Sequence, residues 1–309
     1  MLTFFMMYKP IRRPWISIFI TFVKNNPMEI FRTKKSLVDY IERNREMGKK
    51  IGFAPTMGAL HEGHLSLYEI AKDENDLVIA SIFVNPTQFN NQEDLIKYPR
   101  TVDKDLQLLE KTHHVDGVYI PSVEDIYPNG TKSKTYDFGG IDKEMEGAFR
   151  PGHFDGVGTV VEELLRQVKP NNAYFGEKDY QQLAIIKKLV EITKLPVRIH
   201  GVPIVREKSG LALSSRNQRL TEKQHSEAKL IHETLVKVQY WFGKISLEEI
   251  KNRVFEIFDD APGFRMEYFI IADEKTLKEA VKIDPKKKYR AFIVVYLGDV
   301  RLIDNIALG

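Results

Sequence analysis

The chain has 309 residues, of which 43% are hydrophobic and 29% charged, with a net charge of +3 and no cysteine. This length is enough for two domains with their own cores, and the composition is that of a globular protein rather than a disordered or fibrous one. So small a net charge gives no argument for nucleic-acid binding, and the lack of cysteine excludes disulfides, thiolate catalysis and cysteine-ligated zinc. A reducing compartment is compatible with this composition, and we expect a cytoplasmic protein.

The first 27 residues differ from the rest of the chain. They are apolar and basic and contain no acidic residue. Their longest apolar run, Trp15–Val23, is far too short to span a membrane, and no small-residue cleavage site follows it. We expect residues 1–27 to be a disordered or non-native extension, with Met28 as the working initiator. A weak membrane-surface anchor is the alternative.

From Met28 onward, strand and helix patterns alternate. An amphipathic helix begins near Ser36 and runs towards Gly48, and a short buried strand follows at 50–53. The continuous apolar run 77–84 is typical of a strand buried on both faces of a parallel sheet. A further helix and a strand at 117–121 follow it. This alternation predicts an α/β fold with a Rossmann-like, doubly wound parallel sheet.

The loop after the first of these strands carries the strongest site signal. Gly58 and Gly63 mark the turn, and His61 and His64 stand where the next helix begins. Histidines three residues apart lie on one helical face, and a helix N-terminus favours anions through its free N–H groups and dipole. We interpret this loop as a site for a phosphate-bearing ligand.

Two more loops are predicted at the same rim of the sheet, where ligands of open α/β sheets bind. Asn85 and Gln88 lie in the polar loop that follows the strand at 77–84. Lys178 follows Gly176 at the end of a strand at 172–175, and Gln182 stands just beyond it. Each of these residues also has an ordinary structural interpretation, as a surface lysine or as an amide that satisfies loop backbone.

Between these two regions lies a glycine-rich loop at 146–156, which precedes a helix with apolar positions from 157 to 165. A strand at 197–200 closes the first domain. The chain then changes character, with helices at about 221–242 and 246–259 and strands at 265–272, 289–297 and 300–303. Gly298-Asp299 predicts a hairpin between the last two strands.

We therefore divide the chain into an extension (1–27), a Rossmann-like domain (28–204) and a smaller C-terminal α+β domain (205–309). The loop Ser214-Ser215-Arg216 lies at the start of the C-terminal part. Hydroxyls beside an arginine suit phosphate oxygens, although an ordinary helix cap would look the same.

These motifs resemble those of a known family. His61-Glu62-Gly63-His64 is similar to the H-x-G-H signature of the nucleotidyltransferase superfamily, and Leu213–Asn217 to its mobile second signature. More narrowly, the chain from Met28 resembles the pantoate–β-alanine ligase family. The segments that carry this resemblance are Pro55–His64, Ile82–Phe89, Tyr98–Thr101, Phe175–Gln182 and Leu213–Asn217. The first signature alone indicates only the superfamily, whereas all five in this order are highly specific.

The resemblance implies an AMP-forming ligase. The carboxylate of (R)-pantoate would attack the α-phosphate of ATP to give pantoyl adenylate and pyrophosphate. The amine of β-alanine would then attack the acyl carbon to give pantothenate and AMP. The family also implies that residues 28–204 bind ATP and pantoate, and that residues 205–309 are a lid domain that closes over them. Magnesium and a homodimer are implied as well.

The resemblance also assigns roles to residues. It implies that His64 is a proton donor and that Gln88 holds pantoate and β-alanine, with Gln182 on pantoate; we expect Asn85 to contact substrate as well. The catalytic set is His64, His61, Lys178, Ser214, Ser215 and Arg216. The ATP-binding set is Met57, Gly58, Ala59, Leu60, His61, Glu62, Gly63, His64, Gly176, Glu177, Lys178, Asp179, Val205, Leu213, Ser214, Ser215 and Arg216.

One departure limits the transfer of metal ligands. Family members often place adjacent acids where this chain reads Asp103-Lys104-Asp105, and the intervening lysine leaves the magnesium ligands unassigned. Oxygen atoms of ATP and water can hold the ion with little help from the protein.

Two other functions compete with the ligase interpretation. A nucleotidyltransferase that forms a dinucleotide would share the first signature but would not need Gln88 and Gln182 together. A nucleic-acid-binding module would need a basic, aromatic-rich face, which the near-neutral charge does not suggest.

Overall fold

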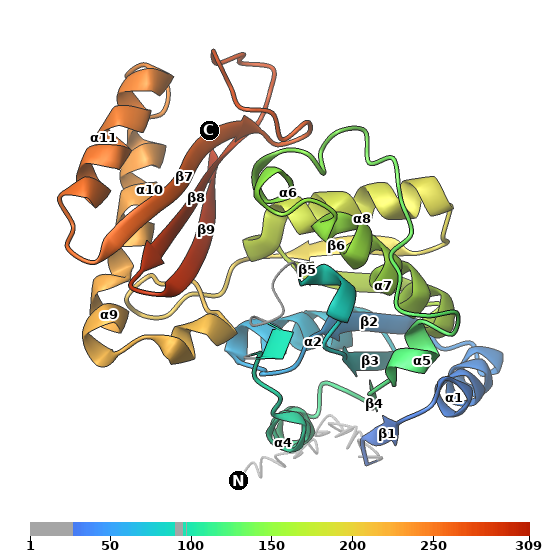
Figure 1. The fold of residues 1–309 in the computed structure, drawn as a ribbon. Coiled ribbons are helices and arrows are strands. Elements are labelled where there is room, and N and C mark those ends of the chain that lie inside the picture. The colour runs from blue at the N-terminus through green and yellow to red at the C-terminus, as the bar shows by residue number, and fades with distance from the viewer. Residues whose placement is uncertain (1–26, 90–94, 97) are drawn as a thin grey trace, which may run out of the picture.

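The computed structural model describes residues 27–89, 95–96 and 98–309, and these form two sheets joined by a loop (Figure 1). The larger sheet is parallel throughout, with strand order β1-β4-β3-β2-β5-β6, which confirms the predicted Rossmann-like architecture. The expected extension at 1–27 lies outside the described residues except for Pro27. The strands are β1 (Glu29–Phe31), β2 (Ile51–Thr56), β3 (Leu77–Ile82), β4 (Gly117–Tyr119), β5 (Asn172–Gly176) and β6 (Arg198–Val202).

Helices cover both faces of this sheet, because the central strands β2, β3 and β5 are buried on both sides. Residues of α1, α7 and α8 pack with Phe53 and Ile79 in one core, whereas α2 and α4 pack with Ala54 and Val78 in the other. The predicted helices in this region are thus confirmed. Their bounds are α1 (Lys34–Glu46), α2 (Glu62–Glu74), α4 (Val102–Thr112), α7 (His153–Val168) and α8 (Tyr180–Thr193), with the short α5 (Val123–Ile126) and α6 (Met145–Phe149) between α4 and α7.

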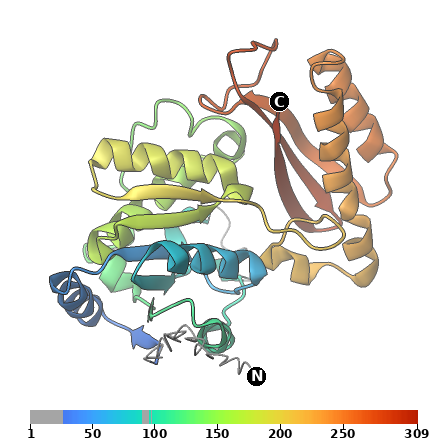
Figure 2. The same ribbon diagram turned by 180° about the vertical axis from the view of Figure 1, so that it is seen from behind.

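The smaller sheet is antiparallel and has helices packed on both of its faces. Its three strands follow one another in the order β7-β8-β9, and the predicted hairpin at Gly298-Asp299 joins β8 to β9. Helices α10 and α11 cover the outer face, as Figure 2 shows, and α6 and α8 of the first domain pack on the inner face. The elements are β7 (Phe264–Asp273), β8 (Tyr289–Leu297), β9 (Val300–Leu308), α9 (Glu222–Glu227), α10 (Lys229–Trp241) and α11 (Leu247–Asp259).

Several elements differ from the prediction. The short helices α5 and α6 were not predicted, and β2 continues to Thr56, three residues beyond the predicted end at Phe53. The edge strand β1 was not predicted, because three residues carry too little pattern, and it is defined by pairing with β4. The helical stretch 221–242 is two helices that separate at Ala228, a fully buried residue. Strand β9 continues five residues beyond the predicted end at Ile303, because the polar Asp304 and Asn305 have buried polar partners.

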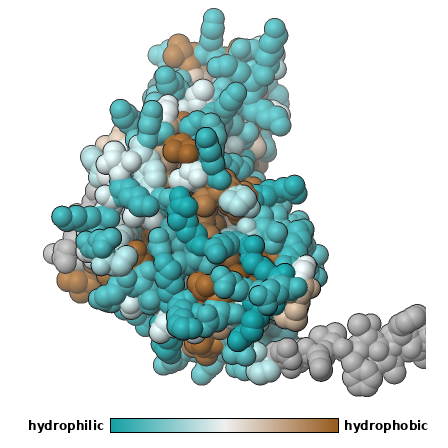
Figure 3. Space-filling model, turned by 90° about the vertical axis from the view of Figure 1, so that its right-hand side faces the viewer, coloured by the Kyte–Doolittle hydropathy of each residue, from teal (hydrophilic) through white to brown (hydrophobic). Residues whose placement is uncertain are grey.

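The surface offers no broad apolar face on the side shown in Figure 3, where hydrophobic side chains are scattered among hydrophilic ones. Within the described residues, none of the helices combines the length and the apolar character needed to cross a membrane.

A close approach between α7 and the loop after β3 requires a glycine. A Cβ added at Gly156 would lie 2.5 Å from the carbonyl oxygen of Thr87, which is backbone and cannot rotate away. The carbonyl of Gly156 in turn accepts a hydrogen bond from the Asn85 amide at 3.1 Å. This contact holds the 85–89 loop, with Gln88, against α7.

We therefore expect Gly156→Ala to lower the free energy of unfolding by about 1–3 kcal/mol, although an added methyl in a helix normally stabilises. Urea unfolding followed by circular dichroism measures the change. Gly176→Ala is the control, since it adds a methyl at a φ of −72° with no heavy atom within 4 Å. Equal stability of the two variants would contradict the close contact.

Candidate active site

The topology brings two loops together at one edge of the parallel sheet. The chain leaves β2 towards β3 and β4 on one side, and later enters β5 and β6 on the other side of β2. The carboxyl ends of β2 and β5 are therefore adjacent, at the point where open α/β sheets bind ligands. From β2 comes the loop with the two histidines, and from β5 comes the 3₁₀ turn η2 (Glu177–Asp179) with Lys178.

The loop after β2 is held by a buried carboxylate. Asp105, in the first turn of α4, is 2% exposed and accepts hydrogen bonds from the backbone N–H groups of Ala59 at 3.0 Å and Leu60 at 2.8 Å. The hydroxyl of Thr101 donates to the same carboxylate. Gly58 and Ala59 both have positive φ, and this strained turn aims the chain at the start of α2. The carboxylate thus fixes the route of the loop.

The two histidines at the start of α2 are held by each other and by backbone. The Nδ1 atom of His61 accepts the N–H of Gly63 at 3.2 Å, and the Nδ1 atom of His64 accepts the N–H of His61 at 3.3 Å. Their ring centroids are 4.0 Å apart. Because each Nδ1 is an acceptor, the neutral tautomer carries its hydrogen on Nε2, so that each ring keeps one N–H donor for a ligand.

Burial keeps both rings neutral. Burial first, and then the nearby Lys178 charge, lowers the pKa of His61 to about 4. Burial together with His61 and Lys178 lowers the pKa of His64 to about 3. Near neutral pH the pair therefore presents hydrogen-bond donors without positive charge. Among the described residues that line the cavity, Lys178 and Arg216 are the lysine and arginine side chains.

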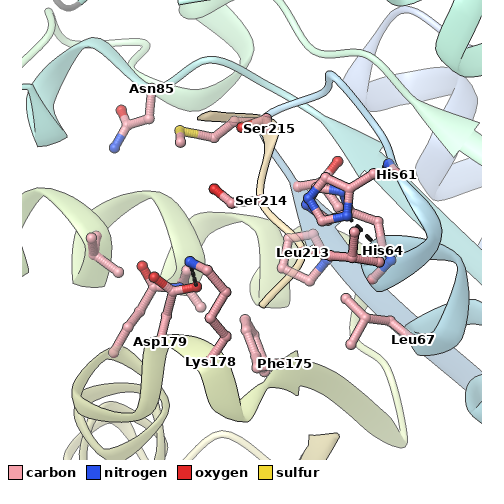
Figure 4. Close-up of a pocket in the computed structure, with 18 of the residues that line it drawn as sticks. His61, His64, Leu67, Asn85, Phe175, Lys178, Asp179, Leu213, Ser214 and Ser215 are labelled. Carbon is pink, nitrogen blue, oxygen red and sulfur yellow. Dashed lines mark hydrogen bonds and ion pairs between the residues drawn. The ribbon is translucent and has the colours of Figure 1, made fainter. Parts of the chain in front are cut away.

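The loop 205–217 brings its residues over the same cavity. Its backbone folds back on itself, with Leu213 N–H bonded to the Val205 carbonyl at 3.0 Å. Ser214 begins the 3₁₀ turn η3 (Ser215–Arg219) and accepts the N–H of Arg216 at 3.2 Å. Figure 4 shows the histidines and Lys178 on opposite sides of the cavity, with Leu213 and Ser214 between them. The two signature segments therefore face one another.

These loops enclose a cavity of about 240 Å³. The predicted residues that line it are Met57, His61, Gly63, His64, Asn85, Gln88, Gly176, Lys178, Asp179, Gln182, Val205, Leu213, Ser214, Ser215 and Arg216. One wall is apolar and comes from α7. It consists of Val157, Val160, Val161 and Leu164.

Five predicted ATP-binding residues do not line the cavity. The N–H groups of Ala59 and Leu60 are occupied by Asp105, and Gly58 forms the turn before them. Glu62 lies in the first turn of α2, outside the lining. The side chain of Glu177 faces Arg290 of the C-terminal sheet, 3.8 Å away.

The amides predicted to hold substrate differ in how far the protein already uses them. Asn85 is 1% exposed, donates to Gly156 and Gln88, and accepts from Thr87 and Tyr127, so its amide is saturated by protein. Gln88 donates to the sulfur of Met57 at 2.7 Å.

Two adjacent glutamines at the start of α8 have different surroundings. Gln181 is buried and binds backbone of residues 141–146 through both ends of its amide. Gln182 lines the cavity and makes no side-chain hydrogen bond within the described part of the chain. Of the three predicted amides, Gln182 is the one best placed to receive a ligand, and Asn85 acts on the shape of its loop.

Sequence reasoning missed several residues of the site. Tyr98, which belongs to one of the segments that carry the resemblance but was not among the predicted site residues, lines the cavity. Arg150 and His153 both contact the backbone carbonyl of Gln88, at 3.0 and 2.9 Å. The glycine-rich loop 146–156 was recognised, but nothing in its pattern pointed to a partner so distant in the sequence.

The acidic residues near the cavity do not form a metal cage. Among the described residues, no three His, Asp or Glu side chains come together in a way that could hold a metal ion. Asp105 spends its oxygens on N–H groups, and Asp179, which lies 3.6 Å from the Lys178 ammonium, is the half-exposed carboxylate of the cavity. This donor set fits magnesium that arrives on phosphate oxygens and keeps water ligands.

Comparison with known proteins gives one consistent result. The family model for pantoate–β-alanine ligase matches residues 29–307. Pantothenate synthetase of Christiangramia forsetii is 51% identical over 91% of this chain and 100% of its own length, and that of Flavobacterium psychrophilum is 48% identical over 91% and 100%.

Solved structures agree. The crystal structure of pantothenate synthetase from Thermus thermophilus has a TM-score of 0.83 and 39% identity, covering 90% of this chain and 99% of that one. Pantoate-beta-alanine ligase from Francisella tularensis, crystallised with beta-gamma ATP and β-alanine, has a TM-score of 0.75 and 41% identity, covering 91% and 97%.

The hydrogen bonds that Asp105 accepts from Ala59 and Leu60 form a clamp on the loop after β2. This clamp predicts that Asp105 contributes more to stability than the nearby Asp103. In Asp105→Asn an amide N–H replaces one acceptor and faces a backbone N–H, so we expect the free energy of unfolding to fall by about 2 kcal/mol. Asp103→Asn, an exposed change in the same helical turn, should leave it within about 0.5 kcal/mol. Chemical unfolding of both variants measures the difference, and equal stability would exclude the clamp.

The neutral histidines predict a pH dependence of stability. A pKa lower in the folded chain than the ordinary value of 6.5 means that the unfolded chain binds more protons, so the free energy of unfolding falls as pH falls below that value. We expect His64→Gln to remove about 3 kcal/mol of the loss seen between about pH 7 and about pH 4. Urea titrations across this range measure it, with the exposed His113→Asn as control. Parallel curves for His64→Gln and wild type would contradict the burial of a neutral ring.

Proposed function

The chain belongs to the pantoate–β-alanine ligase family, and from this premise we propose that it makes pantothenate in two steps through a pantoyl-adenylate intermediate. In the first step a carboxylate oxygen of (R)-pantoate forms a bond to the α-phosphorus of ATP, and the bond from that phosphorus to the bridging oxygen breaks to release pyrophosphate. In the second step the β-alanine amine attacks the acyl carbon, and AMP leaves. The observation that carries the proposal is the meeting of both signature segments with Lys178 around one cavity.

The first step brings two anions together, so its barrier depends on placed positive charge and hydrogen-bond donors. We assign the charge to Lys178 and Arg216, which line the cavity from different segments of the chain. Ser214 and Ser215 supply hydroxyls beside them. Magnesium bound to the phosphates would neutralise further charge, and Asp179 is the carboxylate that would face it. The protein then supplies orientation rather than a covalent intermediate.

We propose that His61 and His64 act through their Nε2–H groups. Neutral rings bind an oxygen of the leaving pyrophosphate as hydrogen-bond donors and cost less to bury than two imidazolium ions. Negative charge that develops on that oxygen raises the pKa of the adjacent His64 ring. His64 is therefore the proton donor of the proposed reaction only once ATP is bound.

The amide side chains that line the cavity suit pantoate and β-alanine. Gln182 and Gln88 can both donate and accept, which suits a ligand with hydroxyls and a carboxylate. We propose that Gln182 holds pantoate, and that Gln88 lies near pantoate and β-alanine, as the family resemblance implies. The apolar wall of α7 would face the methyl groups of pantoate.

Four further assignments complete the proposal. We propose a homodimer, a cytoplasmic location, and domains at 28–204 and 205–309 whose closure over ATP excludes water from the mixed anhydride. The long loop between β6 and α9 joins the two domains, and the sheet β7–β9 is already packed against α6 and α8.

Pyrophosphate exchange into ATP, with pantoate present and β-alanine absent, tests the first step. We expect exchange in the wild type that depends on pantoate, and a loss of about 100-fold or more in His64→Ala and Lys178→Ala. Lys187→Ala, an exposed lysine on the next helix, is the control and should exchange normally.

Pantothenate formation without exchange would indicate a concerted reaction that has no pantoyl-adenylate intermediate. A product that retains the nucleotide would indicate a nucleotidyltransferase instead. Absence of both exchange and pantothenate would overturn the proposed function.

A further inference from the structure

The C-terminal sheet makes a polar contact with the turn that carries Lys178. Asn305 of β9 is 2% exposed, and its Nδ2 atom donates to the backbone carbonyls of Glu177 at 3.0 Å and Lys178 at 2.9 Å. These carbonyls belong to η2, a single turn between β5 and α8. Both hydrogens of one side-chain amide are thus used on consecutive peptides of the turn.

The orientation of the Asn305 amide is determined by Arg290. The Oδ1 atom of Asn305 accepts from Nη1 of Arg290 at 2.6 Å. A flipped amide would place its NH₂ against the guanidinium and its oxygen against two carbonyls, so the observed orientation is the one that satisfies every group.

Arg290 is itself held in place. It is 8% exposed, its Nε donates to Glu274 at 3.0 Å, and its guanidinium lies 4.0 Å from the ring centroid of Tyr180, the first residue of α8. Buried polar groups that are hydrogen-bonded to several partners in this way have little freedom to move.

The backbone of Asn305 is fixed as well. Its N–H donates to the Asp304 carboxylate, and its carbonyl accepts from Arg206 at 3.3 Å. Arg206 also forms a two-pronged ion pair with Asp304, at 2.6 and 2.9 Å. Arg206 lies in the loop that carries Ser214–Arg216. One buried cluster of the C-terminal sheet therefore connects both cationic segments of the cavity.

We propose that Asn305, oriented by Arg290, is a positioning residue for Lys178. The inference rests on the proposed role of Lys178 in the first step. A lysine side chain has several rotatable bonds, and fixing the peptides on either side of its Cα limits where its ammonium can lie. Misplacement of a catalytic group by about 1 Å can cost about 100-fold in rate. Asn305 is not among the residues that line the 240 Å³ cavity, and it acts through the Lys178 backbone.

The decisive variant is Asn305→Asp, which keeps the size of the side chain and an oxygen for Arg290 but loses both donors to the η2 carbonyls. We expect kcat for pantoate-dependent exchange to fall at least about tenfold, with KM for pantoate changed less than about twofold. Asn305→Ala also lacks the donors but adds no charge, and its kcat for exchange should fall by a similar factor. Val295→Ala is the control, since Val295 is fully buried on the opposite face of the same sheet, against the α10–α11 core, and lies away from η2.

A double-mutant cycle with Lys178→Ala separates positioning from general damage. If Asn305 acts through the lysine, Asn305→Asp should lower the residual exchange of Lys178→Ala less than about twofold. A full additional tenfold loss in that background, wild-type kcat in Asn305→Asp, or an equal loss in Val295→Ala would overturn the inference. Wild-type exchange by Lys178→Ala would overturn the proposed role of the lysine, and the inference with it.

Discussion

The geometry of the site depends on one buried carboxylate. A loop that must turn sharply after β2 leaves backbone N–H groups that no strand or helix satisfies, and Asp105 accepts two of them. Because the carboxylate comes from α4, on the far side of β3 in the chain, the loop is fixed by the packing of the sheet rather than by its own residues. The positive φ at Gly58 and Ala59 is tolerated for the same reason. The position of the start of α2, and with it the positions of both histidines, depends on that turn.

Electrostatic roles in the cavity are separated by type of residue. Burial, and after it the nearby positive charge of Lys178, lowers the pKa of both histidines, so the neutral rings donate hydrogen bonds without repelling Lys178. Charge is left to Lys178 and Arg216, the two residue types that are cationic throughout the physiological range. Asp179, whose carboxylate lies 3.6 Å from the Lys178 ammonium, offsets part of this positive charge.

Much of the fold and part of the site could be predicted from the sequence. Long apolar runs such as 77–84 identify strands without tertiary information, and Gly58, His61 and His64 identify the loop through local chemistry. The prediction failed where an element is defined by a distant partner. Strand β1 exists through its pairing with β4, and β9 was cut short at Asp304 because polar residues in a strand normally indicate its end.

The same physical reason explains the amides. Asn85 was predicted to contact substrate, but its amide is already hydrogen-bonded to Gly156 of α7 and to Tyr127. The neighbouring Gln181 is likewise bound to backbone of the loop 141–146. Gln182 follows Gln181 on α8, and consecutive side chains of a helix point about 100° apart. Gln182 therefore faces the cavity, whereas Gln181 faces the loop 141–146. The sequence shows that a side chain can form hydrogen bonds, but the tertiary structure determines whether protein groups already occupy them.

The apolar wall from α7 has a thermodynamic consequence. Three of its four side chains are valines, whose β-branching leaves essentially one rotamer in a helix. This side of the cavity thus has its shape before any ligand arrives, and the conformational entropy of forming it is lost during folding. A compact branched ligand meets a surface that need not reorder, so less of its binding free energy is offset by immobilising protein side chains.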